Sequence, residues 1–491
     1  MAEPAARRIG TADPVGAHIR LLAGLALAGF GLLAGATLYW GFFQAEALDA
    51  RPDNLRRVIA DRAIQRGRIL DRAGRVLAET KFASPDGPER VYPFPSSAPV
   101  VGYQTWQFGA GAIARATYGA GGAEAAYDLA LRGEVGQGFG DVFATNVLHR
   151  PSRGRDVVLT LDAELQRYAA QLLGQREGAI VVLDVGSGAV RAMVSQPTFD
   201  PSQLDVDGTV STAPARPLFN RATQGVYPPG SIWKAITLAG ALAEGLVQPT
   251  DFVEDGDRVA YFAGFPVRCN NNPPGQTRFD IAHAFGWSCN VTFAELGTKL
   301  GEDRFRRHAR AFGIGDAPPF ALPTAAGSIS THSRMDAPEL ASASFGQGEL
   351  EVSPLQMALV AATLAGDGSV PVPYLLQGVD GVDDGAFHEV RGTWRRAVPD
   401  YVAQSMRDVM AVAARDGWAR SAADAAGIPV GGKTGTAQLA EGAPHAWFIG
   451  YAPTDAPRVA VAVLVVNGGD GASVAAPIGG RVLAEAVKGG E

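Results

Sequence analysis

The sequence predicts an α+β fold, in which segments far apart in the chain form one antiparallel sheet flanked by helices. Strand-like apolar runs occur in two sets, one near residue 185 and one near the C-terminus: 179–183, 190–194, 430–438, 446–451 and 459–466. The first two runs surround the turn Gly186-Ser187-Gly188, a hairpin pattern. The stretch between the two sets, about 228–425, is Ala-rich and mostly helical in pattern. Strands on both sides of a helical insert predict a single sheet that both ends of the chain share.

The N-terminus carries an apolar segment, 21–43, without a charged residue. About 20 apolar residues can cross a bilayer as a helix, so we expect a transmembrane anchor. Three arginines precede the segment and two acidic residues follow it: Arg7, Arg8, Arg20, Glu46 and Asp49. The positive-inside rule then places 1–20 in the cytoplasm and the rest outside. A cleaved signal peptide is the alternative, because Ala45-Glu46-Ala47 has a small-x-small pattern.

Residues 44–155 predict a small, irregular, mostly β extracytoplasmic module. Its first part, 46–66, is polar and Arg-rich and indicates a helix or linker. From Gly67 to Leu77 the pattern becomes β-like and is punctuated by glycines.

A second extracytoplasmic domain is expected at 156–491. It opens with a short strand at 157–161 and a helix that Asp162 can cap. A last helix is expected at 475–488, packed on the predicted sheet.

Composition narrows the class of protein. Hydrophobic residues make up 47% of the 491 residues and charged residues 19%, the balance of a globular chain rather than a disordered one. The net charge of −7 offers no basic surface for nucleic acid. Two cysteines and seven scattered histidines form no metal-binding spacing, so we expect neither a metal nor a cofactor.

The first candidate site is Tyr227-Pro228-Pro229-Gly230-Ser231-Ile232-Trp233-Lys234. A helix is expected at or just after Ser231, and residues three apart share a helix face, so Lys234 can reach the Ser231 hydroxyl. A serine needs a base to act as a nucleophile, and a lysine can serve only if burial or a nearby cation lowers its pKa. Alone, Ser-x-x-Lys also fits a helix cap followed by a surface lysine.

The second candidate is Trp287-Ser288-Cys289-Asn290. Ser288 and Asn290 are two apart, so both side chains can point into one cleft. A hydroxyl can relay a proton and an amide can bind a peptide carbonyl. A turn followed by a helix cap explains the same residues, so this triplet alone decides nothing.

The third candidate is the run Gly431 to Gln438, which contains Lys433-Thr434-Gly435-Thr436. On a strand, Lys433 and Gly435 share one face, while Thr434 and Thr436 share the other. Charge and hydroxyls beside an open strand edge suit a carboxylate-bearing peptide that adds as a further strand. An ordinary edge strand is the alternative interpretation, and the run lacks the pattern of a phosphate loop.

Taken in order, Ser-x-x-Lys, Ser-x-Asn and Lys-Thr-Gly resemble the signature of penicillin-binding proteins and serine β-lactamases. Other tracts resemble class B penicillin-binding proteins, most closely the compact actinobacterial type: Arg66 to Ala78, Leu159 to Gln166, Pro197 to Pro201, Phe345 to Gly348, Ser353 to Gln356 and His445 to Gly450. The resemblance runs from about residue 60 to 470 and implies a peptidoglycan D,D-transpeptidase.

The resemblance also implies a role for each site residue. Ser231 attacks the carbonyl between the two terminal D-alanines of a stem peptide, and Lys234 takes its proton. The backbone N–H groups of Ser231 and Thr436 hold the oxyanion. Ser288 passes a proton to the leaving D-alanine and Asn290 holds the donor peptide.

In the same resemblance, Lys433, Thr434 and Thr436 bind the terminal carboxylate, beside Gly435. An amine of a second stem peptide then attacks the acyl-enzyme. β-Lactams acylate Ser231 as substrate mimics. A membrane glycosyltransferase is the expected partner. Gly31 and Gly35 form a GxxxG pair that could pack against another membrane helix, and a Gly/Ala-rich span with no partner is the alternative.

Three rival functions share the motifs. A β-lactamase needs a group that activates water, and Glu339, Glu349 and Glu351 are acids in the right interval but in no recognised pattern. A D,D-carboxypeptidase would hydrolyse the same acyl-enzyme. A β-lactam sensor or scaffold usually needs a cytoplasmic signalling domain, for which about 20 residues before the anchor leave no room.

The two cysteines, Cys269 and Cys289, both follow the anchor, in a compartment where disulfides persist. We expect them to form a disulfide that fixes the loop between Ser288 and Asn290. Two free thiols are the alternative, because cysteine is often buried as a small apolar residue.

Overall fold

The structure is a computed structural model that describes residues 14–44, 47–48, 64–84, 87–108, 115–136, 138, 140, 153–204, 215–256, 258–269, 272–382 and 387–489. The chain divides into two compact units, one formed by 1–62 with 107–116 and one by the remaining residues. Most of the predicted helix or linker at 46–66 lies outside the described residues.

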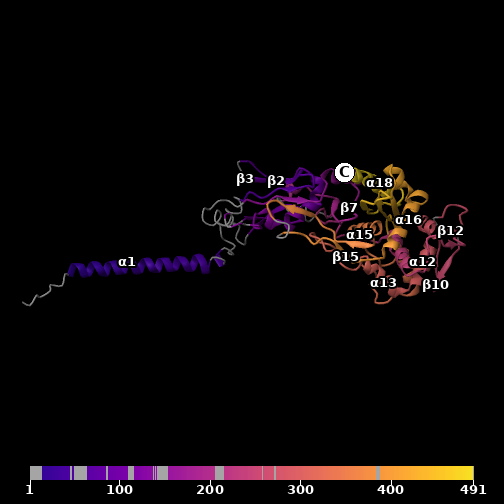
Figure 1. The fold of residues 1–491 in the computed structure, drawn as a ribbon, viewed down its shortest axis with the longest axis horizontal. Coiled ribbons are helices and arrows are strands. Elements are labelled where there is room, and N and C mark those ends of the chain that lie inside the picture. Colours follow the sequence, from indigo (N-terminus) through magenta and orange to yellow (C-terminus); the bar gives the residue numbers. More distant parts are fainter. Residues whose placement is uncertain are drawn as a thin grey trace, which may run out of the picture. The chain divides into compact units, whose positions relative to one another are not determined.

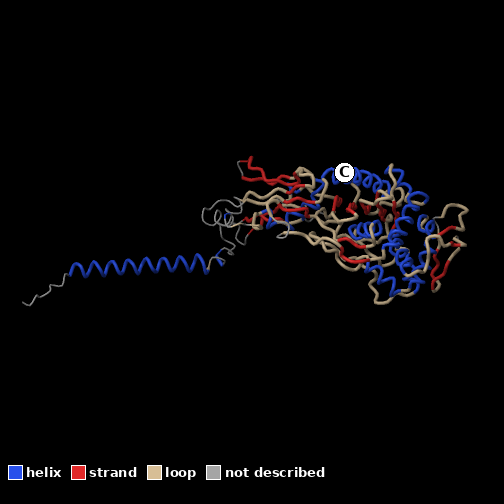
Figure 2. Tube along the Cα trace, in the orientation of Figure 1, coloured by secondary structure: helices blue, strands red, loops and turns tan. Residues whose placement is uncertain are grey.

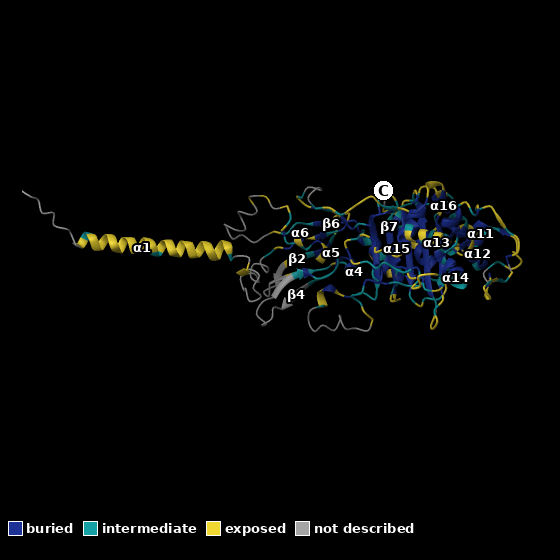
Figure 3. Cartoon of the chain, turned by 90° about the horizontal axis from the view of Figure 1, so that it is seen from below, coloured by how far each residue is buried: buried dark blue, intermediate teal, exposed yellow. Residues whose placement is uncertain are grey.

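The N-terminal helix α1 spans Pro14–Leu38 and continues as a π-helical turn over Tyr39–Phe43. It contains the predicted apolar span and begins earlier, at Pro14, a residue type that the first turn of a helix tolerates. Arg20 therefore lies inside the helix, where its Nε donates to the Gly16 carbonyl at 3.1 Å. Figure 3 shows α1 exposed along its length. The helix is long and apolar enough to cross a membrane.

The central sheet of the second unit is built as the sequence predicts. Its five antiparallel strands come in the order β16 (Gly431–Ala437), β17 (His445–Ala452), β18 (Val459–Val465), β7 (Gly178–Asp184) and β8 (Val190–Gln196). Strands from the two ends of the chain meet where β18 pairs with β7, with Val461 opposite Val182. The apolar runs of β18 and β7 are buried on both faces, which explains why they show no polar alternation.

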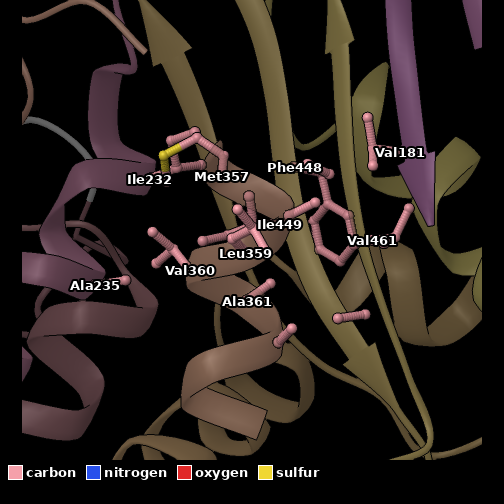
Figure 4. Packing of buried hydrophobic residues seen from close by; sticks show 14 of the residues in the cluster. Val181, Ile232, Ala235, Met357, Leu359, Val360, Ala361, Phe448, Ile449 and Val461 are labelled. Carbon is pink, nitrogen blue, oxygen red and sulfur yellow. The ribbon is translucent and has the colours of Figure 1, made fainter. Parts of the chain in front are cut away.

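Helices cover the two faces of this sheet (Figures 1 and 2). α15 (Pro354–Ala365) packs on β7, β17 and β18, and Figure 4 shows Leu359 beside Ile449 of β17. α18 (Ala475–Lys488) and α8 (Ala163–Leu173) pack on the sheet from the other side. There Gly479 of α18 allows close approach to the ring of Phe448, the neighbour of Ile449 in β17. Asp162 caps α8 as predicted, since its Oδ1 accepts from the Glu164 and Leu165 N–H groups at 3.1 and 3.3 Å.

A second sheet joins the predicted module to the predicted domain. Its strands, in spatial order, are β14 (Leu376–Val379), β6 (Val157–Leu159), β1 (Ile69–Leu70), β2 (Val76–Ser84) and β3 (Gly87–Val91). The predicted boundary between 155 and 156 therefore falls inside one hydrogen-bonded sheet, in which β1 and β6 are parallel. The division at this boundary stays a prediction.

A buried charge cluster supports the N-terminal side of that sheet. The Glu124 carboxylate is fully buried and accepts from Arg66 Nε and Arg90 Nε, each at 2.7 Å. Burial alone would raise the pKa of Glu124, but the two guanidinium groups lower it. Removing both arginines would leave a buried carboxylate without a counter-charge, which is costly.

The remaining elements are short or belong to the helical insert. Before β7 and after β8 they are η2 (Pro95–Ser97), α4 (Ala98–Val101), β4 (Gln104–Phe108), β5 (Arg115–Gly119), α5 (Gly122–Ala126), α6 (Asp128–Leu131) and η3 (Pro201–Gln203). The insert contains η4 (Gly230–Trp233), α10 (Lys234–Ala243), β9 (Phe252–Val253), β10 (Ala260–Phe262), β11 (Phe265–Val267), β12 (Phe279–Asp280), α11 (Ile281–Gly286), α12 (Asn290–Leu300), α13 (Glu302–Ala311), α14 (Ala337–Ser344), β13 (Ser369–Pro371), β15 (Thr393–Arg396), α16 (Asp400–Asp416) and α17 (Arg420–Ala426). The insert is mostly helical as predicted, and the short strands within it were not predicted.

Candidate active site

Ser231 and Lys234 lie at the start of a helix, as the sequence predicts. Ser231 is in the 3-10 turn η4, and Lys234 is the first residue of α10. The turn lies close against β16: a Cβ added to Gly230 would lie only 2.8 Å from the Ala437 nitrogen. Gly230 also has a φ of +56°, a conformation that glycine adopts at little cost. A glycine before Ser231 thus allows the serine to lie beside the strand.

Lys234 Nζ is the centre of the site. It lies 3.0 Å from Ser231 Oγ, 2.8 Å from Ser288 Oγ, 2.8 Å from the Ser288 carbonyl oxygen and 2.7 Å from Asn290 Oδ1. A neutral amine has two N–H donors and one lone pair. The carbonyl and amide oxygens can only accept, so they match the two N–H groups and leave the lone pair for a hydroxyl. The arrangement therefore suits a lysine that accepts a proton from serine.

Electrostatics favour that neutral form. The Lys234 side chain is completely buried, and burial lowers its pKa well below the usual value, with the charge of Lys433 lowering it further. Burial alone lowers the pKa of Lys433 to about 7. Because a buried ammonium is poorly solvated, both lysines lose their protons more readily than surface lysines do.

The second motif is held in a tight turn between α11 and α12. Ser288 has a φ of +65°, an uncommon conformation for a residue with a side chain, and its N–H donates to the Phe285 carbonyl at 3.1 Å. The turn points the Ser288 hydroxyl at Lys234. Asn290 begins α12, so a helix terminus rather than a loop fixes its side chain.

The predicted disulfide between Cys269 and Cys289 is confirmed. The two residues are bonded, with their Cα atoms 4.6 Å apart. Two tryptophans brace the same turn from the other side: Trp418 Nε1 donates to the Trp287 carbonyl at 3.2 Å, and Trp287 Nε1 donates to the Asp416 carbonyl at 3.1 Å. The second motif is thus fixed covalently and by hydrogen bonds.

The third motif forms β16, which lies at the edge of the central sheet and pairs only with β17. Thr434 and Thr436 share the strand face expected of them. Gly435 faces η4, and a Cβ there would lie 2.9 Å from Ile232 Cγ2. The Thr436 hydroxyl donates to Asp470 Oδ1 at 3.2 Å and accepts from the Gly471 N–H at 3.1 Å.

Lys433 points away from solvent. Its side chain is 1% exposed, its Nζ donates to the Thr434 carbonyl at 2.9 Å, and the ring of Phe285 lies 5.6 Å from Nζ. Its ammonium is therefore buried, outside the described lining of the cavity, and its charge lowers the pKa of Lys234. That Lys433 also binds a ligand carboxylate stays a prediction.

A cavity of about 790 Å³ opens over the three motifs. Five predicted site residues line it: Ser231, Ser288, Asn290, Thr434 and Thr436. Lys234, Lys433 and Gly435 are not among its described lining residues.

The same cavity is lined by side chains that the sequence analysis did not assign to the site: Trp418, Arg420, Ser421, Asp424, Gln438, Asp470 and Ser473. Trp418 lies in the connection between α16 and α17, and Arg420, Ser421 and Asp424 lie in α17 itself. Gln438 directly follows β16, and Asp470 and Ser473 lie in the loop after β18. No local motif marks these segments, because only the closure of the sheet brings them beside Ser231.

Comparison with known proteins places the chain in a family. Residues 178–484 match the model of the penicillin binding protein transpeptidase domain, which covers more than half of the chain. The chain belongs to this family. The peptidoglycan D,D-transpeptidase PbpA of Mycolicibacterium smegmatis is 36% identical over 94% of this chain and 96% of its own length.

Solved structures of penicillin-binding proteins share the fold. Penicillin-binding protein A of Mycobacterium tuberculosis, as its ceftriaxone acyl-enzyme complex, matches 86% of this chain and 98% of its own with a TM-score of 0.75 and 33% identity. PBP2 of Pseudomonas aeruginosa matches 86% of this chain and 95% of its own with a TM-score of 0.70 and 29% identity. The resemblance to class B enzymes of actinobacterial type is confirmed.

The acids considered for a β-lactamase lie elsewhere in this penicillin-binding protein. Glu339, Glu349 and Glu351 are absent from the described lining of the cavity. Glu339 Oε1 accepts from Ser330 Oγ at 2.6 Å, and Glu349 accepts from the Thr331 N–H at 2.8 Å. Within the described chain, one group could hold a divalent cation: His332, Glu339 and Glu349 place ligand atoms within 4.8 Å of one another. These side chains already contact one another, with His332 Nδ1 3.3 Å from Glu339 Oε2.

Proposed function

We propose that this chain is a peptidoglycan D,D-transpeptidase that cross-links stem peptides through an acyl-enzyme on Ser231. The observation that carries the proposal is the buried amine of Lys234, in contact with the hydroxyls of Ser231 and Ser288 and the amide of Asn290. Family membership supplies the substrate class, since the M. smegmatis relative is named for this activity.

In the first step, Ser231 Oγ attacks the carbonyl between the two terminal D-alanines. Lys234 accepts the hydroxyl proton, the C–O bond forms, and the peptide C–N bond breaks. Lys234 and Ser288 return the proton to the departing D-alanine amine. In the second step an amine of another stem peptide attacks the ester carbonyl and loses a proton to Lys234. The new amide C–N bond forms, the ester C–O bond breaks, and Lys234 returns the proton to Ser231 Oγ.

The donor peptide lies along the open edge of β16 as an added strand. The Asn290 amide holds its backbone, and Thr434 and Thr436 bind its terminal carboxylate beside Gly435. The N–H groups of Ser231 and Thr436 stabilise the oxyanion, a contribution often worth a factor of about 10² to 10³ in rate. Lys433 adds the charge of its buried ammonium to this carboxylate site. β-Lactams acylate Ser231 in the same way.

The anchor and topology complete the proposal. The apolar segment 21–43 spans the membrane, 1–20 are cytoplasmic, and the module at 44–155 and the domain at 156–491 are extracytoplasmic. A membrane glycosyltransferase is the partner. Among the described residues, nothing beyond the local helix backbone would lie within 4 Å of a Cβ added to Gly31 or Gly35, so this face of α1 is open to another membrane helix.

The deciding experiment incubates the full-length protein with lipid-linked precursor and a peptidoglycan polymerase, followed by analysis of the muropeptides. Cross-linked dimers that disappear with Ser231→Ala are the expected result. Release of D-alanine without dimers would identify a carboxypeptidase instead, and rapid hydrolysis of penicillin would identify a β-lactamase.

A further inference from the structure

A second cavity, of about 570 Å³, shares the loop after β18 with the catalytic cavity. Ser473 of this loop lines both cavities, so the loop is their common wall. The other walls come from the C-terminal end of α8, the end of β18 and the first half of α18. The volume is that of a site for a small molecule. The reaction at Ser231 does not use this second cavity.

The second cavity is positively charged. The charged residues of its described lining are Arg176, Glu177 and Arg481. Glu177 already has a counter-charge, because Arg221 Nε lies 2.8 Å from its Oε1. Neither Arg176 nor Arg481 forms an ion pair with a described residue. Two positive charges therefore line one cavity without a carboxylate partner among the described residues, in a chain whose net charge is −7.

The Arg176 guanidinium is held in place by carbonyl groups instead. Its Nη1 donates to the carbonyls of Leu172 and Leu173, in the last turn of α8, at 3.2 and 3.1 Å. Within the described part of the chain, Arg176 Nε and Nη2 have no hydrogen-bond partner, and neither has the side chain of Arg481. The planar guanidinium group suits the paired oxygens of a phosphate or a carboxylate. Both arginines thus keep donors for an anionic ligand.

Backbone hydrogen bonds fix the frame of the second cavity. The Val466 N–H donates to the Glu177 carbonyl at 2.8 Å, which ties the end of β18 to the segment after α8. The Asn467 N–H donates to His445 Nδ1 at 3.0 Å, where the loop leaves the sheet. The cavity is therefore formed before a ligand enters it, which lowers the free-energy cost of binding.

The common loop links the second cavity to the third motif. Ser473 donates to Asp470 Oδ2 twice, through its N–H at 2.9 Å and its Oγ at 3.0 Å. The other oxygen, Asp470 Oδ1, accepts from the Thr436 hydroxyl at 3.2 Å. Because a hydroxyl has one proton, Thr436 can donate it to Asp470 or to a substrate carboxylate, but not to both.

We propose that the second cavity binds a small dianion, a phosphate ester or a dicarboxylate, at Arg176 and Arg481, and that the bound dianion slows acylation at Ser231. The dianion competes with Asp470 for the proton of the Ser473 hydroxyl. Asp470 then loses one donor and holds the Thr436 hydroxyl more firmly, so Thr436 is less available to the substrate carboxylate. This second ligand goes beyond the proposed transpeptidation.

The binding test is isothermal titration calorimetry of the full-length protein with methyl phosphate and with succinate, at constant ionic strength. The two titrations distinguish a phosphate site from a dicarboxylate site. We expect saturable binding, weakened about tenfold by Arg176→Ala or Arg481→Ala, the effect of losing one charge-assisted contact. Arg481→Lys should keep part of the affinity. Arg167→Ala is the matched control, since Arg167 is an exposed, ion-paired arginine of α8 outside the described lining of this cavity.

The second test is stopped-flow acylation by a penicillin, with and without the dianion that binds. A saturating dianion should slow acylation of the wild type about fivefold or more, the usual range for two coupled sites. Arg481→Ala at the same dianion concentration should show little slowing. A penicillin ester lacks the carboxylate that Thr436 is proposed to bind, so the dianion should slow its reaction less.

The site is wrong if neither dianion binds saturably, or if both alanine variants bind as tightly as the wild type. Saturable binding that leaves the acylation rate unchanged would overturn the route through Ser473 and Asp470. A protein that penicillin does not acylate would contradict the proposed function instead. In that case the calorimetric comparison of wild type, variants and control still decides whether the dianion site exists.

Discussion

The Nζ atom of Lys234 lies 3.0 Å from Ser231 Oγ, and Lys234 has no exposed surface. Lys234 can accept the Ser231 proton only if its Nζ is both close to Oγ and buried. A lysine at this distance but in water would stay protonated and could not act as a base, because its usual pKa is about 10.4. The fold excludes water by packing α10 against other helices, and the second motif supplies acceptors for the amine.

Ser231→Ala should abolish covalent labelling by a fluorescent penicillin, because the nucleophilic oxygen is removed. Gel fluorescence of the purified protein measures the adduct. Ser405→Ala is the control, since Ser405 is a surface serine of α16 whose hydroxyl donates to the Tyr401 carbonyl. Labelling of Ser231→Ala at the wild-type rate would assign the nucleophile to another residue.

Lys234→Arg should slow acylation more than about a hundredfold, the usual contribution of a general base. Arginine keeps the charge but does not give up its proton in proteins. Lys234→Met tests the same point with a neutral side chain, and Lys299→Arg on the surface of α12 is the control. Stopped-flow acylation measures the rate and a thermal melt checks the fold. A Lys234→Arg protein that acylates normally would show that Lys234 supplies only charge.

Acylation should rise with pH, with a midpoint well below the ordinary lysine value. The reactive form of Lys234 is unprotonated, and burial followed by the charge of Lys433 lowers its pKa. Lys433→Met removes the second cause, so the pKa of Lys234 should rise and the ascending limb should move to higher pH. The pH profile of the acylation rate measures this shift. An unchanged midpoint in Lys433→Met would mean that the two ammonium groups do not interact.

Lys433→Ala should weaken acylation by carboxylate-bearing β-lactams more than by their esters. A contact between an ammonium and a carboxylate is worth about 1.5–3 kcal/mol, and an ester lacks the charge. Because Lys433 is buried, the test also distinguishes an effect on the ligand carboxylate from an effect on Lys234 alone. If its charge acts only on Lys234, acids and esters will lose the same factor, and the carboxylate will depend on Thr434 and Thr436 alone.

The central sheet could be predicted because each of its strands is a short apolar run that is recognisable from its own residues. The observed strands β7, β8, β16, β17 and β18 end within two residues of the predicted runs. The catalytic pair could be predicted as well, since Ser231 and Lys234 are three positions apart at the start of a helix and therefore share one face. The short strands β9 to β12 could not, because two- and three-residue strands carry no periodic signal.

The cavity wall formed by Trp418, Arg420 and Asp470 could not be predicted from the sequence, for a different reason. Its residues come from segments about 50 positions apart that meet only after the sheet closes. The burial of Lys433 was also missed. Strand alternation states which residues share a face, but it does not state which face the protein covers.

Loss of the disulfide between Cys269 and Cys289 should destabilise the protein and slow its acylation. The double variant Cys269→Ser with Cys289→Ser removes a bridge that closes a loop with a sequence separation of 20, worth about 3 kcal/mol in the loop-entropy model. Because Cys289 stands between Ser288 and Asn290, a looser turn should also misplace the two groups that contact Lys234. Denaturant unfolding and stopped-flow acylation measure the two effects. Intact mass of the wild type should be about 2 Da below the reduced value.

The control is Ser342→Ala, a small polar residue of α14 outside the described cavity lining. Equal stability of the double variant and the wild type would show that the bridge constrains nothing that the surrounding hydrogen bonds do not already hold.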